Sequence, residues 1–141
     1  KKRQAFRDAF YSFNIQEVAN FDEHRTKLLL QNQHIVRNRK KIEAIIHNAQ
    51  KCLEIINRFG SFKHYIWQYT DGRTIVNHYT SFHDIPAQTD VSVKMSKDLK
   101  KQGFRFAGPV ICYAFMQSIG MVNDHIVSCF RYGEVIGRKV Q

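Results

Sequence analysis

The chain has 141 residues, of which 43% are hydrophobic, enough for one folded domain with a substantial core. Lysine and arginine total 22 against 12 aspartate and glutamate residues, a formal net charge of +10, which favours a polyanionic partner such as DNA or RNA. No segment reaches the ~18 apolar residues that span a bilayer, and nothing resembles a signal peptide. The three cysteines show no disulfide-framework spacing, so we expect a reducing, intracellular environment.

Helical patterns follow one another along the chain. Asn14 and Asp22 are typical N-caps of two short helices, and Gly60 is a typical end for the long amphipathic helix before it. Ser92 is expected to open a further helix, and Pro109 suits the first turn of the last one. That last helix is apolar almost all round, so we expect it to be central and buried. The predicted helices cover about residues 15–20, 23–31, 40–59, 62–69, 93–102 and 109–119.

Residues 70 to about 91 are predicted to be irregular, because Asp71-Gly72, Pro86 and clustered serine, threonine and histidine are typical of turns. Strand pairing within residues 74–79 is left open. The chain has no repeats and no low-complexity linker, so we predict one all-α domain, residues 1–141. The opening KKRQAFR already resembles the interior of an amphipathic helix, without a methionine or a cap, so we expect further residues upstream.

The segment Leu99–Pro109 is the strongest candidate for a binding site. Its pattern indicates a helix, a tight hairpin with Gly103 and Gly108 at its ends, and a second helix. Each glycine permits positive φ or close backbone approach, so the hairpin can present N–H groups, which bind phosphate whatever the base. An ordinary helical corner with solvated lysines is the alternative that spacing alone leaves open. The basic residues leading to the hairpin and within it are Lys94, Lys97, Lys101 and Arg105.

A second candidate site lies just downstream. His125 and Cys129 are four residues apart, so they share a face if the segment is helical, and both can ligate zinc. Two ligands do not complete a tetrahedral site, and a buried cysteine beside a hydrogen-bonded histidine is the commoner arrangement. The other two cysteines, Cys52 and Cys112, lie on apolar helix faces and are expected to be unreactive core thiols.

A long ordered match to a known family runs through these segments. The run MSKDLKKQGFRFAGPVICYAFMQ (Met95–Gln117), followed by GMVNDH (Gly120–His125), resembles the signature of the constitutive bacterial 3-methyladenine DNA glycosylase I family. The block IVRNRKKIEAIIHNA (Ile35–Ala49) is similar to a second family block, and the resemblance extends from residue 1 to about 132. It implies the all-α helix-hairpin-helix glycosylase fold, incomplete at its N-terminus. Residues 93–119 would form the helix-hairpin-helix.

The resemblance also implies the site residues. The family binds a structural zinc ion through two cysteines and two histidines, and His125 and Cys129 match one of each. Whether this chain binds zinc therefore stays open. Asn123 takes a pocket-adjacent place where the wider superfamily carries a catalytic aspartate. Family members begin about fifty residues earlier. That N-terminal segment holds the glutamate that contacts the flipped base and the other two zinc ligands, so none of these has a counterpart here. The implied DNA contacts are Lys97, Lys101, Gly103, Phe104, Arg105 and Gly108.

The implied activity is hydrolysis of the N-glycosidic bond of 3-methyladenine in double-stranded alkylated DNA, leaving an abasic site. This lesion base is cationic and departs without prior protonation, so base extrusion, shape recognition and electrostatic support for the sugar cation can suffice. The lysines of residues 94–101 suit phosphate contacts better than an amine nucleophile, which favours a monofunctional enzyme. A cytoplasmic bacterial monomer is implied, nearly inactive as these 141 residues alone. The alternative is a non-enzymatic helix-hairpin-helix DNA-binding module.

Overall fold

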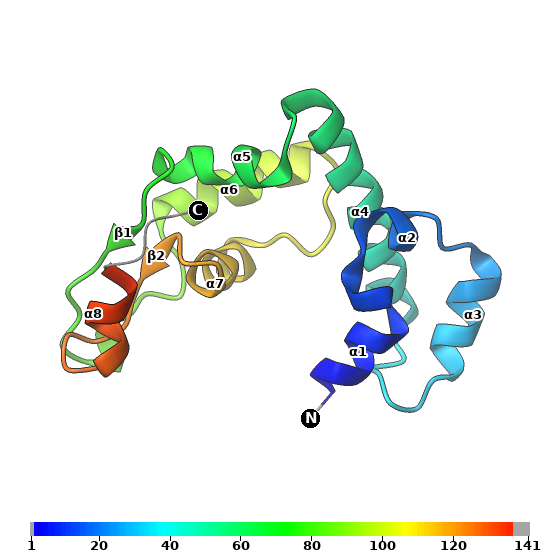
Figure 1. Cartoon of the computed structure of the whole chain (residues 1–141), viewed down its shortest axis with the longest axis horizontal. Helices are drawn as coiled ribbons and strands as arrows, with labels where there is room; N and C mark the ends of the chain where they lie inside the picture. Colours follow the sequence, from blue (N-terminus) through cyan, green and yellow to red (C-terminus); the bar gives the residue numbers. More distant parts are fainter. Residues whose placement is uncertain (1, 137–141) are drawn as a thin grey trace. The chain divides into compact units, whose positions relative to one another are not determined.

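The structure of the chain, a computed structural model, describes residues 2–136 (Figure 1). Helices account for most of these residues, which confirms the all-α prediction. Residues up to 62, together with 102–105, form one compact unit, and residues 63–101, together with 106 onward, form a second. The single domain expected from the sequence stays a prediction. None of the described helices combines the length and the apolar character that crossing a membrane requires.

Polar side chains cap three helices of the first unit, two of them at the residues that the sequence predicts. The Asn14 side chain accepts hydrogen bonds from two backbone N–H groups at the start of α2, and Asp22 accepts one at the start of α3. Asn38 caps α4 by accepting from the Lys41 N–H at 3.1 Å, and Gly60, with a φ of +81°, ends it. The helices are α1 (Arg3–Ala9), α2 (Ile15–Ala19), α3 (Glu23–Gln31) and α4 (Arg39–Phe59), with a 3₁₀ turn at Tyr11–Phe13.

The core of the first unit lies against the apolar face of α4. Its isoleucine and alanine side chains recur at helical spacing and meet Phe10, Val18 and Leu29 of the shorter preceding segments. Phe10 is completely buried, and burial of a side chain of that size contributes roughly 2–3 kcal/mol. This packing holds the long helix in place and leaves its polar face to contact another segment.

The second unit contains a very short sheet that pairs two of its segments. β1 (Ile75–Val76) pairs in parallel with β2 (Val122–Asn123), with Ile75 opposite Val122 (Figure 1). The strand pairing that the sequence left open within residues 74–79 is therefore present, but only two residues long. The helices are α5 (Phe62–Trp67), α6 (Asp90–Lys101), α7 (Pro109–Ser118) and α8 (Phe130–Ile136), with 3₁₀ turns at Gln68–Thr70 and Phe82–Asp84.

α6 begins earlier than the sequence indicated. Thr89 and Ser92 exchange hydrogen bonds across the first turn, with the Thr89 N–H donating to Ser92 Oγ at 2.9 Å and the Ser92 N–H donating to Thr89 Oγ1 at 3.4 Å. This reciprocal arrangement satisfies two N–H groups that a helix start leaves without partners. Ser92 therefore lies inside the first turn and does not open the helix.

α7 departs from its prediction in burial. Cys112, Tyr113 and Met116 are buried, but Val110 is 51% exposed and Ile111 is 61% exposed. The expectation of a wholly buried helix is therefore wrong for the described residues. An apolar composition permits a helix to be buried on every side. The segments that pack against the helix determine which of its sides are in fact buried.

Candidate functional site

The first half of the predicted hairpin docks on the polar face of α4, within the first unit. The Nε2 atom of His47 lies 2.9 Å from the Gly103 carbonyl oxygen. The Asn48 side chain donates to the Arg105 carbonyl oxygen at 2.9 Å and accepts from the Arg105 N–H at 2.9 Å. Lys51 packs beneath Gly103, where a Cβ would lie 3.1 Å from its Cε atom. Three side chains from two successive turns of one helix therefore fix residues 103–105.

Gly103 meets both requirements that the sequence assigned to it. Its φ of +91° lies in the region that favours glycine, and the close approach of Lys51 leaves little room for a side chain. Gly108 meets neither, because its φ is −71° and no atom lies within 4 Å of the place of a Cβ. The fold of the chain itself therefore does not require a glycine at position 108, and the proposed contact of this glycine with DNA stays a prediction.

The aromatic residues of the hairpin have different surroundings. The Phe104 ring stacks on Phe62, with ring centroids 6.1 Å apart, and is half-buried. Phe106 is 60% exposed and has a positive φ of 56°, which is unusual outside glycine. Phe104 is among the DNA contacts that the family resemblance implies, and Phe106 is not. The sequence alone does not show which of these two phenylalanines is exposed.

The second half of the hairpin is held within the second unit. The hydroxyl of the buried Ser96 donates to the Ala107 carbonyl oxygen at 2.6 Å, and the Cys112 thiol approaches the same oxygen at 3.8 Å. The Gly108 carbonyl oxygen accepts from the Cys112 N–H at 2.9 Å, the first backbone hydrogen bond of α7. Burial raises the pKa of the Cys112 thiol above its usual range, in keeping with an unreactive core thiol.

The basic stripe lies exposed along α6. Lys94, Lys97 and Lys101 are all at the surface, and Lys101 Nζ lies 3.8 Å from Asp98 Oδ1. The Lys101 side chain is 78% exposed, so this ion pair is worth little and leaves its charge accessible to a phosphate. Arg105, within the hairpin, is also exposed. The positive charge of each of these side chains is therefore accessible to a phosphate.

His125 and Cys129 come together without a helix. Residues 124–129 form a turn before α8, and the Nδ1 atom of His125 lies 3.7 Å from the Cys129 Sγ atom. Zinc ligands at ~2.1 Å (nitrogen) and ~2.3 Å (sulfur) on tetrahedral positions lie about 3.6 Å apart, so the pair fits two ligands of one zinc ion. Within residues 2–136, no cluster of three or more histidine, cysteine or acidic side chains could hold a metal.

Asn123 holds this turn from beneath. It is 1% exposed, its Oδ1 atom accepts from the His125 N–H at 3.3 Å, and its Nδ2 atom donates to the Tyr132 carbonyl oxygen at 3.0 Å. Both ends of the amide are therefore engaged within the chain. These two hydrogen bonds join the end of β2 to α8 and to the segment that carries His125.

The next residue, Asp124, joins three segments of the second unit. Its carboxylate accepts from Asn77 Nδ2 at 2.7 Å and from Gln117 Nε2 at 2.7 Å. Asp124 itself is 8% exposed, and both hydrogen bonds are partly buried. Nearby, burial raises the pKa of the Tyr113 hydroxyl far above its usual range. The carboxylate fixes the end of β2 against α7 and the segment after β1.

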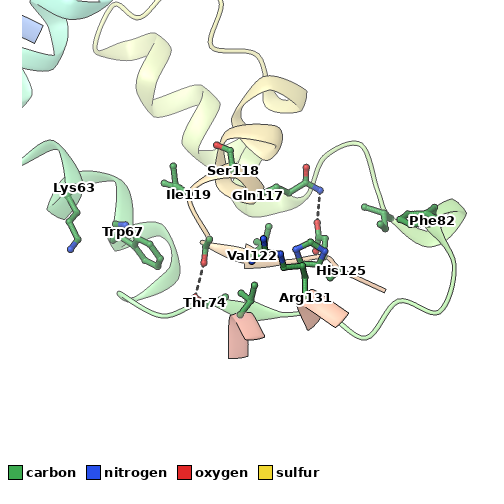
Figure 2. Close-up of a pocket in the computed structure, with 14 residues that line it drawn as sticks. Lys63, Trp67, Thr74, Phe82, Gln117, Ser118, Ile119, Val122, His125 and Arg131 are labelled. Carbon is green, nitrogen blue, oxygen red and sulfur yellow. Dashed lines mark hydrogen bonds between the residues drawn. The ribbon is translucent and has the colours of Figure 1, made fainter. Parts of the chain in front are cut away.

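A cavity of about 730 Å³ opens beside Asp124 and His125 (Figure 2). Trp67 and Phe82 contribute aromatic walls, and the side chain of Arg131 contributes positive charge. Neither Phe82 nor Trp67 belongs to a motif, so no sequence pattern indicates that they line a cavity. Asn123 does not line this cavity, although both of its chain neighbours do.

The fold and the site together define a class of protein. It is basic and all-α, and it carries a hairpin, anchored at Gly103, between two helices. The comparisons identify it further: the chain belongs to the methyladenine glycosylase family, whose sequence profile matches residues 1–132. It is 40% identical over 132 residues to DNA-3-methyladenine glycosylase 1 of Escherichia coli K12, covering 94% of this chain and 71% of that protein. It is 39% identical over 129 residues to the Haemophilus influenzae DNA-3-methyladenine glycosylase, covering 92% and 70%.

Solved structures agree with the sequence comparisons. A crystal structure of a 3-methyladenine DNA glycosylase I superposes with a TM-score of 0.89 at 42% identity, over 92% of this chain and 71% of that one. The Staphylococcus aureus enzyme, solved to explain 3-methyladenine recognition, superposes with a TM-score of 0.89 at 35% identity, over 92% and 69%. The family resemblance noted in the sequence is thereby confirmed.

Proposed function

We infer that this chain belongs to a DNA-repair glycosylase that hydrolyses the N-glycosidic bond of 3-methyladenine in alkylated DNA and leaves an abasic site. The observation that carries this conclusion is the family match over residues 1–132, with two relatives near 40% identity that bear this activity in their names. The match favours an enzyme over the alternative of a DNA-binding module without catalysis.

We propose that the substrate is double-stranded and that residues 93–119 act as a helix-hairpin-helix. The exposed lysines of α6 and Arg105 would neutralise phosphates, while the hairpin backbone would fix the register of the protein on the strand. The damaged base must leave the stack to be reached. Because 3-methyladenine departs as a cation, the enzyme needs to support the developing sugar cation more than to protonate the base. A monofunctional enzyme follows, since the lysines placed here suit phosphate contacts.

We propose further that His125 and Cys129 supply two of the four ligands of a structural zinc ion. The 3.7 Å separation of their ligand atoms supports this, and Asn123 holds the turn that carries them. Such an ion contributes folding stability and leaves no position for a reacting water. A bacterial cytoplasmic location, supported by the bacterial relatives, and a monomeric state, tested by sedimentation, are parts of the same proposal.

The test of the zinc proposal is the metal content of the product of the complete gene. We expect about one zinc per chain, with Cys129→Ala losing the metal and lowering Tm, while the folded fraction still excises base. Cys52→Ala, at a thiol of the first unit, is the matched control and should keep the metal. Full zinc content in Cys129→Ala would mean that the short contact is only a thiol–imidazole hydrogen bond.

The activity itself is tested by base release. The product of the complete gene is incubated with duplex DNA that carries 3-methyladenine and, separately, with undamaged duplex at equal concentration. We expect release of the methylated base from the first and none from the second. Tight binding to both duplexes without release of any base would support the binding-module alternative and refute the inferred activity.

A further inference from the structure

We propose that Asn48 of α4, together with His47, is the residue that positions the DNA-binding hairpin. This inference rests on the proposed function of residues 103–108 and names the part of the protein that gives the hairpin its shape. No motif in the sequence connects α4 with the hairpin, since Asn48 and Arg105 are 57 residues apart.

The Asn48 side chain pairs with Arg105 as a neighbouring strand would. It donates to the carbonyl oxygen and accepts from the N–H of the same residue, each at 2.9 Å. A planar amide that engages both groups of one residue fixes the backbone direction there, because both groups must face the same side. The guanidinium of Arg105 remains exposed and available for a phosphate.

His47 and Lys51 contact the hairpin two residues earlier, at Gly103. A carbonyl oxygen only accepts, so His47 Nε2 must donate to Gly103 at 2.9 Å. The stem of Lys51 lies under Gly103, whose missing side chain lets the backbone approach α4. The hairpin is thus held at two backbone positions before any DNA is present, which reduces the ordering cost of binding.

The chemistry at this position is specific to asparagine. Aspartate lacks the N–H group that reaches the Arg105 carbonyl oxygen, and it would add a negative charge beside the proposed phosphate site. Glutamine has both groups but one more methylene, which would push the hairpin away from α4. Asn57 is an exposed residue of the same helix with no side-chain hydrogen bond among the described residues, and it provides a matched control.

The experiment compares Asn48→Ala, Asn48→Asp and Asn57→Ala with the unaltered product of the complete gene. DNA affinity is measured on methylated duplex at several salt concentrations, and base release is measured with DNA in excess. We expect Asn48→Ala to bind about tenfold more weakly, while the rate of release at saturating DNA changes by less than about twofold. The slope of log affinity against log salt should stay unchanged, because no phosphate-binding charge is removed. Asn57→Ala should match the unaltered protein, and Asn48→Asp should bind more weakly than Asn48→Ala.

Amide hydrogen exchange provides a readout that needs no activity. In the unaltered protein the Arg105 N–H should exchange at least about tenfold more slowly than an unprotected amide, and Asn48→Ala should remove that protection. Unprotected Arg105 in the unaltered protein would overturn the inference, as would unchanged DNA affinity in Asn48→Ala. If the unaltered protein excises no methylated base, the proposed function fails, whereas the exchange result still tests the contact.

Discussion

The Asp124 carboxylate offers a quantitative test of how the second unit is held together. Its two charge-assisted hydrogen bonds, from Asn77 and Gln117, are each 2.7 Å long and lie around a residue that is 8% exposed. Removing the carboxylate in Asp124→Ala leaves both amides without their acceptor. Hydrogen bonds to charged groups contribute about 1.5–3 kcal/mol each. The adjoining cavity lets water replace part of that, so we expect a loss of about 3 kcal/mol.

A loss of this size should lower the Tm by roughly 10 °C in a chain of 141 residues. Thermal unfolding is followed by the fluorescence of Trp67, the single tryptophan, which lies in the same unit. Asp124→Asn keeps one oxygen and should lose only about 1 kcal/mol. The control is Glu134→Ala, which removes a surface ion pair with Arg131 and should change the Tm by less than about 3 °C. A Tm loss in Asp124→Ala no larger than that of the control would refute the reasoning.

Three further outcomes are expected. Replacing Lys101 or Arg105 with alanine should weaken binding to any duplex and reduce the salt slope by about one, and an unchanged slope in titrations would remove these residues from the DNA surface. Gly103→Ala should destabilise the fold by about 1 kcal/mol or more because of its positive φ, whereas Gly108→Ala should leave the Tm unchanged and weaken DNA binding if the hairpin backbone contacts phosphate. Burial raises the pKa of the Cys52 thiol to about 11, so its alkylation rate should rise about tenfold per pH unit from 8 to 10 in the folded protein; a plateau near pH 9, the behaviour expected of the unfolded chain, would contradict this.

Local signals in the sequence account for much of the first unit. Asn14 and Asp22 cap helices at the predicted positions because a side-chain acceptor satisfies N–H groups nearby in the sequence. Gly60 ends α4 for the same kind of local reason. α8 was missed because Gly133 interrupts the pattern, and a glycine inside a helix costs about 1 kcal/mol relative to alanine. Its hydrogen bonds to preceding segments compensate in ways that no local pattern shows.

The candidate site was predictable only in part. The hairpin and the His125–Cys129 pair are recognisable because their residues are close in sequence. The contact of Asn48 with Arg105 is not recognisable. It joins residues 57 positions apart, and it is made with the backbone groups of Arg105, which are the same in almost every residue. Gly108 shows the opposite limit: the sequence marks a glycine, but among the described residues no atom lies within 4 Å of the place where its Cβ would be.

The central claim, that this protein is a monofunctional 3-methyladenine DNA glycosylase, is tested most directly by analysis of its reaction products. The product of the complete gene is incubated with duplex containing a single 3-methyladenine, and both base and strand are recovered. We predict free 3-methyladenine and an intact strand that breaks only after alkali. Strand cleavage without alkali and a covalent adduct trapped by borohydride would contradict a monofunctional enzyme. Complete retention of the methylated base in the strand would contradict the account as a whole.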